Sequence, residues 1–190
     1  MEIQDRELTP MESLQMITEV ISKTKDNLRE HSFPFLLWGW LIAAASFLFF
    51  CLHTYTSFNL YFLPFPILAT AGIVVTIRFF AGHRFVSETW LSYYLKRMWL
   101  VLGLAFILVV VINVIGHNPP FTYTLLIAGI GTMISGLVLR FRPLVFGGIV
   151  FLLSSVSSVV VADMYKPLLM GVAVVFGYLI PGYLLKRSTL

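Results

Sequence analysis

The chain has 190 residues, of which 58% are hydrophobic and only 12% are charged, and its formal net charge is +4. An ordinary soluble domain carries about 25% charged residues, so this composition excludes a water-soluble globular protein. Its apolar runs are long enough to cross the roughly 30 Å hydrocarbon core of a bilayer as helices. They are continuously apolar and do not alternate, which disfavours a closed β-barrel.

The first predicted element is a cytoplasmic amphipathic helix within residues 1–32. Thr9, Pro10 and Glu12 form a helix-start pattern, with an N-cap, a proline at the first helical position and an acidic residue in the first turn. Apolar residues then recur at spacings of three, four and seven, which indicates one apolar face: Leu14, Ile17, Ile21 and Leu28. Four surfaces can cover this stripe: a copy in a neighbouring subunit, the cytoplasmic ends of the spans, the bilayer surface, or another protein.

Residues 31–34 (HSFP) are expected to end that helix, because the residue before a proline is disfavoured in the α region. Six apolar runs follow, at residues 33–52, 61–80, 98–115, 121–139, 144–162 and 168–185. They predict an all-α membrane protein, with a six-transmembrane-helix bundle of three consecutive hairpins in a domain covering residues 33–190. The loop between the second and third runs is expected to contain an interfacial helix that starts near Ser87.

The cations predict the orientation. If the N-terminus is cytoplasmic, every Lys and Arg except Lys166 falls on the cytoplasmic side, as the positive-inside rule requires. We therefore expect a multi-pass protein of a bacterial-type cytoplasmic (inner) membrane with both termini in the cytoplasm. Membrane lipids are the expected partners, and no nucleic acid is expected, since the positions of the cations explain the net charge. Five of these cations are candidates for contact with anionic lipid headgroups: Arg78, Arg140, Arg142, Lys186 and Arg187. The positive-inside rule alone also accounts for their positions.

The fifth run carries four serines within five residues. At 100° per residue, its small residues share one face: Gly147, Gly148, Ser154, Ser155, Ser158 and Ala162. Val156 and Val160 lie on the opposite face. Such a face favours close helix packing, but its hydroxyls could instead line a solute path. Asp, Glu, Lys and Arg are missing from the middle of every run, which disfavours an ion-coupled carrier. Pro181 is expected to kink the sixth run.

Polar residues near the outer ends of the runs form the candidate site. Three short outer loops of one bundle must lie close together, so we consider a polar vestibule made of His53, Asn113, His117, Ser154, Ser158 and Asp163. Within it, His53, His117 and Asp163 are weak candidates for metal ligands. The alternative is that these are ordinary solvated residues at a membrane interface.

Motifs of catalysis are missing from the sequence. It contains no HExxH, GxSxG, phosphate-binding loop or CxxC pair, and Cys51 is its single cysteine. We therefore expect no catalytic residue and no cofactor, and an enzyme is disfavoured. The first hypothesis is a non-enzymatic protein that associates with itself or a partner through the N-terminal helix and the small-residue faces. The second is a small channel or facilitator along the serine face, and the third is a metal-binding or enzymatic site on the outer surface.

Overall fold

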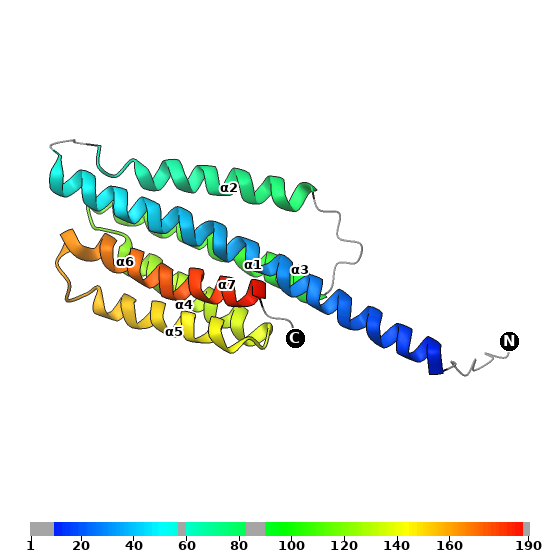
Figure 1. The fold of residues 1–190 in the computed structure, drawn as a ribbon. Helices are drawn as coiled ribbons and strands as arrows, with labels where there is room; N and C mark the ends of the chain where they lie inside the picture. Colours follow the sequence, from blue (N-terminus) through cyan, green and yellow to red (C-terminus); the bar gives the residue numbers. More distant parts are fainter. Residues whose placement is uncertain (1–9, 57–59, 83–89, 188–190) are drawn as a thin grey trace.

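A computed structural model describes residues 10–56, 60–82 and 90–187, with side chains described from Ser32 onward except at residues 82 and 90. Every regular element of this part of the chain is helical (Figure 1). The elements are α1 (Pro10–Tyr55), α2 (Pro64–Gly82), α3 (Trp90–Ile115), α4 (Phe121–Val138), α5 (Arg142–Ser157), the 3-10 helix η1 (Asp163–Tyr165), α6 (Lys166–Val174), the π-helix η2 (Val175–Leu179) and α7 (Ile180–Arg187).

Among the described residues, five helical segments are long and apolar enough to cross a membrane: Ser32–Tyr55, Pro64–Ala81, Leu91–Ile115, Phe121–Val138 and Asp163–Arg187. The protein is thus a multi-pass membrane protein by the length and composition of its helices. Helix α5 is apolar but has only 16 residues. The fifth of the six expected runs is therefore a shorter helix than its 19-residue apolar run suggested, because the α-helix ends at Ser157 and the chain continues in turns.

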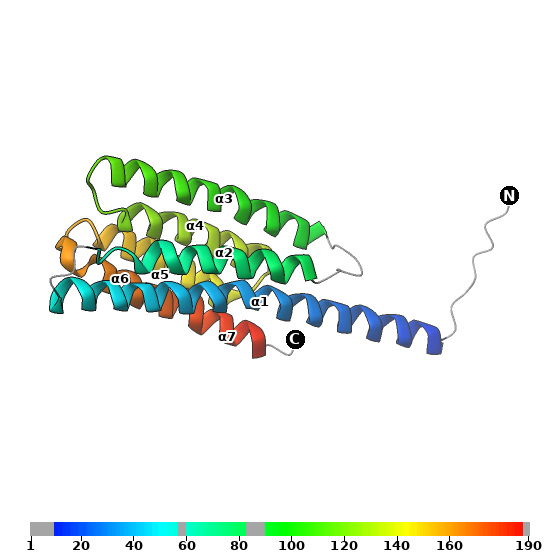
Figure 2. The ribbon, with the colours of Figure 1, turned by 90° about the horizontal axis from the view of Figure 1, so that it is seen from above.

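The helices run up and down along one axis, so that the chain reverses at each connection (Figures 1 and 2). Helices α4 and α5 make the most extensive contact, and α1 packs against α2, α6, η2 and α7. The core lies between α4, α5, the last helix and the C-terminal half of α1, where Leu125, Leu144 and Phe151 have no exposed surface. Helix α3 packs mainly against α4 and lies at the edge of the bundle.

The helix break predicted at residues 31–34 is wrong, because α1 continues through these residues. It is one continuous helix of 46 residues that passes through Pro34. Proline removes one backbone hydrogen bond, but membrane helices tolerate this where neighbouring helices hold the chain; here Ser32, Phe35 and Gly39 are buried beside it. The helix begins at Pro10 as predicted, whereas Thr9 lies outside the described residues.

The expected interfacial helix before the third span is also corrected. Residues from Trp90 onward belong to α3, which continues without interruption to Ile115. Ser87, where the separate helix was expected to start, lies outside the described residues. Within α3, Leu95 is buried in the core, so this first part of the helix is held by packing with the bundle.

The last helix contains a local widening near Pro181. Segments α6, η2 and α7 follow one another without a break, and the five residues of η2 form a π-helix. Pro181 has no N–H, so it cannot donate the usual bond to the carbonyl of Gly177 four residues earlier. A π-helical turn just before the proline adjusts the hydrogen bonding around this gap.

Candidate functional site

The serine face of α5 is buried against α4. Gly147, Gly148, Ser155 and Ser158 are buried on this face, whereas Val156, on the opposite face, is 72% exposed. The remaining members of the predicted face differ, since Ser154 is half-buried and Ala162 is exposed beyond the end of α5. Hence the face predicted from helical periodicity is the packed one along most of α5.

The serine hydroxyls of α5 join two helices. Ser155 Oγ donates to the backbone carbonyl of Thr122 at 2.8 Å. Ser158 Oγ lies 2.8 Å from the Thr122 hydroxyl and 2.6 Å from the carbonyl of Ser155. Interhelical bonds of this kind contribute about 0.6 kcal/mol each in a membrane protein. These hydroxyls therefore bind protein groups and do not line an open path.

Glycines bring the backbones of α4, α5 and η2 into direct contact. A Cβ atom at Gly147 would lie 2.5 Å from the carbonyl oxygen of Gly177, which is the carbonyl that Pro181 deprives of its usual donor. A Cβ at Gly136 would lie 2.5 Å from the backbone nitrogen of Val145. Real Cβ atoms do not approach other atoms this closely, so each glycine is required by a helix crossing.

A polar cluster occupies the centre of the bundle. Trp99 Nε1 of α3 donates to Ser135 Oγ of α4 at 3.0 Å, and Ser135 Oγ donates to the carbonyl of Gly131 at 2.8 Å. The hydroxyl of Tyr178 in η2 is hydrogen-bonded to Thr132. These bonds connect three helices around a buried centre, which explains why a Trp and a Tyr are tolerated there.

Sequence analysis did not find this central cluster. In the sequence, Thr132 lies three residues after Gly129 and four before Gly136, and this helical spacing of small residues is a partial signal. Its partners come from segments far apart in sequence, and periodicity within one helix cannot show which side chains of different helices meet. The ring of Tyr178 also packs against Phe151, with ring centroids 4.7 Å apart, so the cluster is enclosed by apolar groups.

Three residues of the predicted outer vestibule, His53, Asn113 and Asp163, have partners close to them in the sequence. The ring of His53 lies 4.6 Å from that of Tyr61, and Asn113 donates to the carbonyl of Val109 in its own helix. Asp163 forms a salt bridge with Lys166 at 2.6 Å. His117 is exposed and has a positive φ of 54° at the end of α3. Ser158 is buried between α4 and α5, so it does not face an outer vestibule.

The predicted metal ligands do not gather. Among the described residues, which include His53, His117 and Asp163, no three His, Cys, Asp or Glu side chains form a group that could hold a metal ion. The separation of these residues could not be predicted from the sequence, because sequence patterns do not show how the three outer connections lie relative to one another.

The two ends of the bundle differ in charge. One end, which also holds the projecting part of α1 and the end of α7, carries six exposed Lys and Arg residues (Figure 1): Arg78, Arg97, Arg140, Arg142, Lys186 and Arg187. We call this the cationic end. Between residues 32 and 187, the only acidic residue whose side chain the structure describes is Asp163, at the opposite end and paired with Lys166. Five of the six exposed cations were predicted as headgroup contacts from sequence.

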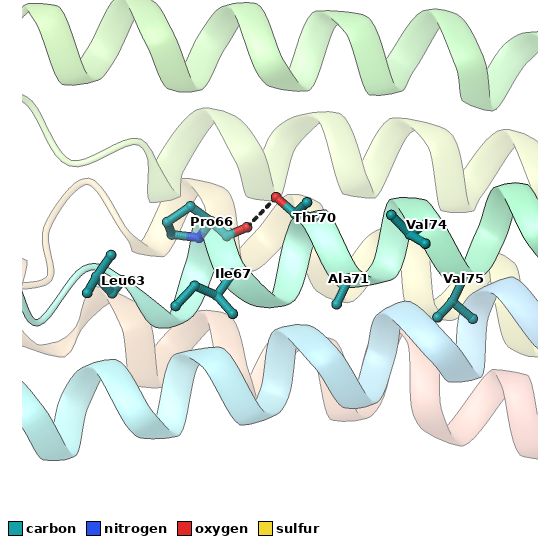
Figure 3. Close-up of a pocket in the computed structure, with 7 residues that line it drawn as sticks. All are labelled: Leu63, Pro66, Ile67, Thr70, Ala71, Val74 and Val75. Atoms are coloured by element: carbon teal, nitrogen blue, oxygen red, sulfur yellow. Dashed lines mark hydrogen bonds between the residues drawn. The ribbon is translucent and has the colours of Figure 1, made fainter.

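A shallow apolar groove runs along the outer side of α2 (Figure 3). Its walls include Leu63, Ile67, Ala71 and Val74, and the Thr70 hydroxyl inside it donates to the carbonyl of Pro66 at 2.7 Å. Because that hydroxyl is satisfied within its own helix, the groove offers an apolar surface suited to lipid chains.

Helix α1 extends far beyond the cationic end (Figures 1 and 2). Its membrane-length part starts at Ser32, and roughly 20 helical residues precede it, which corresponds to about 30 Å at 1.5 Å per residue.

Comparison of the chain with protein-family models, with curated proteins and with solved structures finds no match.

Proposed function

We propose that this protein is a membrane anchor that holds the N-terminal part of α1 out into the cytoplasm and acts by association with a partner, without catalysis. The observation that carries the proposal is the continuity of α1, a single helix of 46 residues. Its C-terminal half packs against the bundle from Ser32 onward. A helix held rigidly at one end and extended at the other is suited to presenting a binding surface.

The connectivity supports six membrane crossings. Helix α4 and the last helix run in the same direction along the bundle (Figure 1), and both are long enough to span. If both cross the bilayer, α5 must return the chain to the other side between them. Its 16 residues correspond to about 24 Å, and the turns after Ser157 add the remaining distance. The glycine contacts of α5 with α4 fit a buried, short crossing.

The charge distribution supports a cytoplasmic location for the cationic end. Short loops with an excess of Lys and Arg remain on the cytoplasmic side of a membrane, and five of the six cations at this end were candidates for headgroup contact. Exposed Tyr93 and Tyr183 lie near Arg97 and Lys186 in sequence, and aromatic residues of this kind are enriched at the headgroup level. Both termini then lie in the cytoplasm.

The direction of α1 favours another molecule over the bilayer as its partner. A helix that lies on a membrane surface must turn sharply where it leaves the span, and α1 has no break between Pro10 and Tyr55. The projecting part also extends past the ends of the other helices (Figure 2). Its apolar stripe would remain in water without cover, at a cost of about 25 cal/mol per Å².

The channel hypothesis receives less support. It needed free hydroxyls along α5, but Ser155 and Ser158 are bonded to Thr122 and to the backbone. Phe151 fills the space beside them and has no exposed surface. A packed interior of this kind fits an anchor better than a solute path.

Site-specific photo-crosslinking in intact cells tests the proposed function. A photoreactive residue is introduced in place of Ile17 or Ile21 on the stripe, and in place of Glu19 or Asp26 on the opposite face as a matched control. We expect discrete adducts from the two stripe positions and weak or no adducts from the controls. Equal adduct patterns at all four positions, or no adduct at any of them, would contradict association through α1.

A further inference from the structure

The outer side of α2 carries the apolar groove of Figure 3, which runs from Leu63 to Val75, and an exposed arginine lies just beyond its Val75 end. We propose that this groove and Arg78 form a binding site for one anionic phospholipid of the leaflet at the cationic end. One acyl chain of the lipid lies along the groove, and the headgroup phosphate contacts the Arg78 guanidinium. The site is independent of the association through α1.

Helix α2 turns one side to α1 and leaves the groove side open. Among the described elements, α1 is the only one that makes extensive contact with α2. A Cβ atom at Gly72 would lie 2.8 Å from Leu41 and 3.2 Å from Trp38, both of α1. At 100° per residue, Gly72 points about 155° away from the mean direction of the groove residues. The groove therefore faces the acyl chains of the surrounding membrane.

Arg78 belongs to the same side of α2 as the groove. It follows Val74 by four residues, which is about one helical turn or 6 Å, and its direction lies within about 35° of the mean groove direction. Its side chain is exposed. The next residue, Phe79, stacks on Phe33 of α1 with ring centroids 3.9 Å apart. This stacking fixes the position of the end of α2, so Arg78 is held at a defined distance from the groove.

The dimensions of the groove suit one acyl chain. Its volume is about 620 Å³, which lies within the roughly 300–1,000 Å³ range of small-ligand sites. Leu63 and Val75 are 12 residues apart, or about 18 Å along the helix. Half of the roughly 30 Å hydrocarbon core, the part filled by the chains of one leaflet, is about 15 Å thick. The Thr70 hydroxyl is bonded to the carbonyl of Pro66 and adds no unsatisfied donor.

The charge around Arg78 selects an anionic headgroup. An arginine stays charged at physiological pH, and its planar guanidinium can donate two parallel hydrogen bonds to one phosphate. Among the side chains that the structure describes, the only carboxylate is that of Asp163, which is paired with Lys166 at the opposite end of the bundle. No described carboxylate therefore competes with a phosphate for Arg78. A choline headgroup gains less, because it carries its own cation beside the phosphate.

A helix of another chain fits this side of α2 less well. Membrane helices approach one another closely where small residues meet, but Gly72, in the middle of α2, faces α1. The groove side exposes branched side chains instead, and Ile67 and Val74 are 59% and 47% exposed. A flexible acyl chain can follow the surface between such side chains, whereas they keep a helix backbone at a distance.

Photoactivatable lipids test the site in the full-length protein. Nanodiscs of phosphatidylcholine receive a small fraction of a probe with a diazirine on one acyl chain, which is either phosphatidylglycerol or phosphatidylcholine. After irradiation, the adducts are mapped by mass spectrometry. We expect adducts within residues 63–75 to be about fivefold more abundant with the phosphatidylglycerol probe, which is the preference that one arginine at a membrane surface gives an anionic lipid.

Variants separate the arginine from the groove. Arg78→Gln should reduce the ratio of the two probes to about one, whereas Arg78→Lys should keep most of it. Arg142→Gln, which removes an exposed cation of α5 at the same end of the bundle, is the matched control and should leave the ratio unchanged. Ala71→Trp fills the groove and should lower the adducts from both probes. Thermal unfolding shows whether each variant is folded, and the parent ratio and Ala71→Trp decide even if Arg78→Gln does not fold.

Three results would overturn the proposal. Equal yields from the two probes in the parent protein would show that the site does not select an anionic lipid. A ratio that survives Arg78→Gln, or adducts that survive Ala71→Trp, would place the lipid elsewhere. Efficient disulfide formation between two copies of a Val74→Cys/Cys51→Ser variant would assign the groove to a second copy. Crosslinking from Ile17 and Ile21 tests the association through α1 separately, so the two proposals fail independently.

Discussion

Two sides of the bundle follow different rules of packing. In the 18-residue apolar stretches of α4 and of the last helix, half of the residues are buried. In the corresponding stretch of α2 only 6% are buried, and in that of α3 none are. Gly147 of α5 faces the backbone of η2, whereas Gly103 of α3 has no atom within 4 Å of a Cβ built on it. The same residue type is therefore a packing requirement in one place and a lipid-facing residue in the other.

This difference separates the structural part of the protein from its lipid-facing part. Lipid is as apolar as leucine, so membrane helices associate through close backbone contact and interhelical hydrogen bonds. Helices α4, α5 and η2 have both. Helix α3 contributes Trp99 to the centre, but beyond that residue its second half is largely exposed.

The largest effect is expected where backbones touch. Gly147→Leu should lower the free energy of unfolding by about 3 kcal/mol or prevent folding, because even its Cβ would meet the Gly177 carbonyl at 2.5 Å. Gly103→Leu is the matched control and should be nearly neutral. Thermal unfolding of both variants in detergent measures the difference. Equal losses would show that the two sides do not differ in packing.

The serine face gives the next largest effect. Ser158→Leu should destabilise by about 2 kcal/mol, because the site is fully buried and its hydroxyl bonds would be lost. Val156→Leu lies two residues away on the lipid-facing side and should change stability little. Urea or detergent unfolding of both variants decides this. A sensitive Val156 would place that position in a protein contact.

The central cluster should show a smaller loss. Tyr178→Phe removes the bond to Thr132 and keeps the aromatic packing on Phe151, so we expect a loss of about 1 kcal/mol. Tyr123→Phe, on an exposed position of α4, serves as the control. If Tyr178→Phe is neutral by thermal unfolding, the cluster contributes packing alone.

The turn between α4 and α5 should give the smallest effect, in the opposite direction. Arg140 has a positive φ of 51°, and the N–H groups of Arg140 and Phe141 bond to the carbonyls of Leu137 and Gly136, as in a Schellman motif. Glycine is preferred at this position, so Arg140→Gly should stabilise the protein in neutral detergent by about 0.5–1 kcal/mol. A destabilised variant would mean that the guanidinium makes a structural contact.

Sequence patterns predicted the elements better than their relations. Composition and run length predicted an all-α multi-pass protein, and helical periodicity identified the buried face of α5 at Gly147 and Ser158. The break at Pro34 was wrong because a local preference against helix was outweighed by packing of Ser32, Phe35 and Gly39 on other helices. Such tertiary contacts are not encoded in a short window.

The candidate site was harder to predict for the same reason. His53, His117 and Asp163 were grouped because their loops were expected to meet, yet they form no metal-binding group in the described residues. The cluster of Trp99, Ser135 and Tyr178 was missed because its members come from three helices. Register within one helix is readable from sequence, whereas register between helices depends on how each pair packs.

The continuity of α1 across Pro34 is the central claim, and a distance between two spin labels tests it most directly. Labels are placed by Glu12→Cys and Phe47→Cys in a Cys51→Ser background, with the protein in lipid nanodiscs. A continuous helix separates these positions by about 52 Å, at 1.5 Å per residue over 35 residues. A narrow distribution near that value would agree with the account. A sharp turn at residues 31–34 would shorten the distance to roughly 40 Å, and a distribution centred there would contradict it.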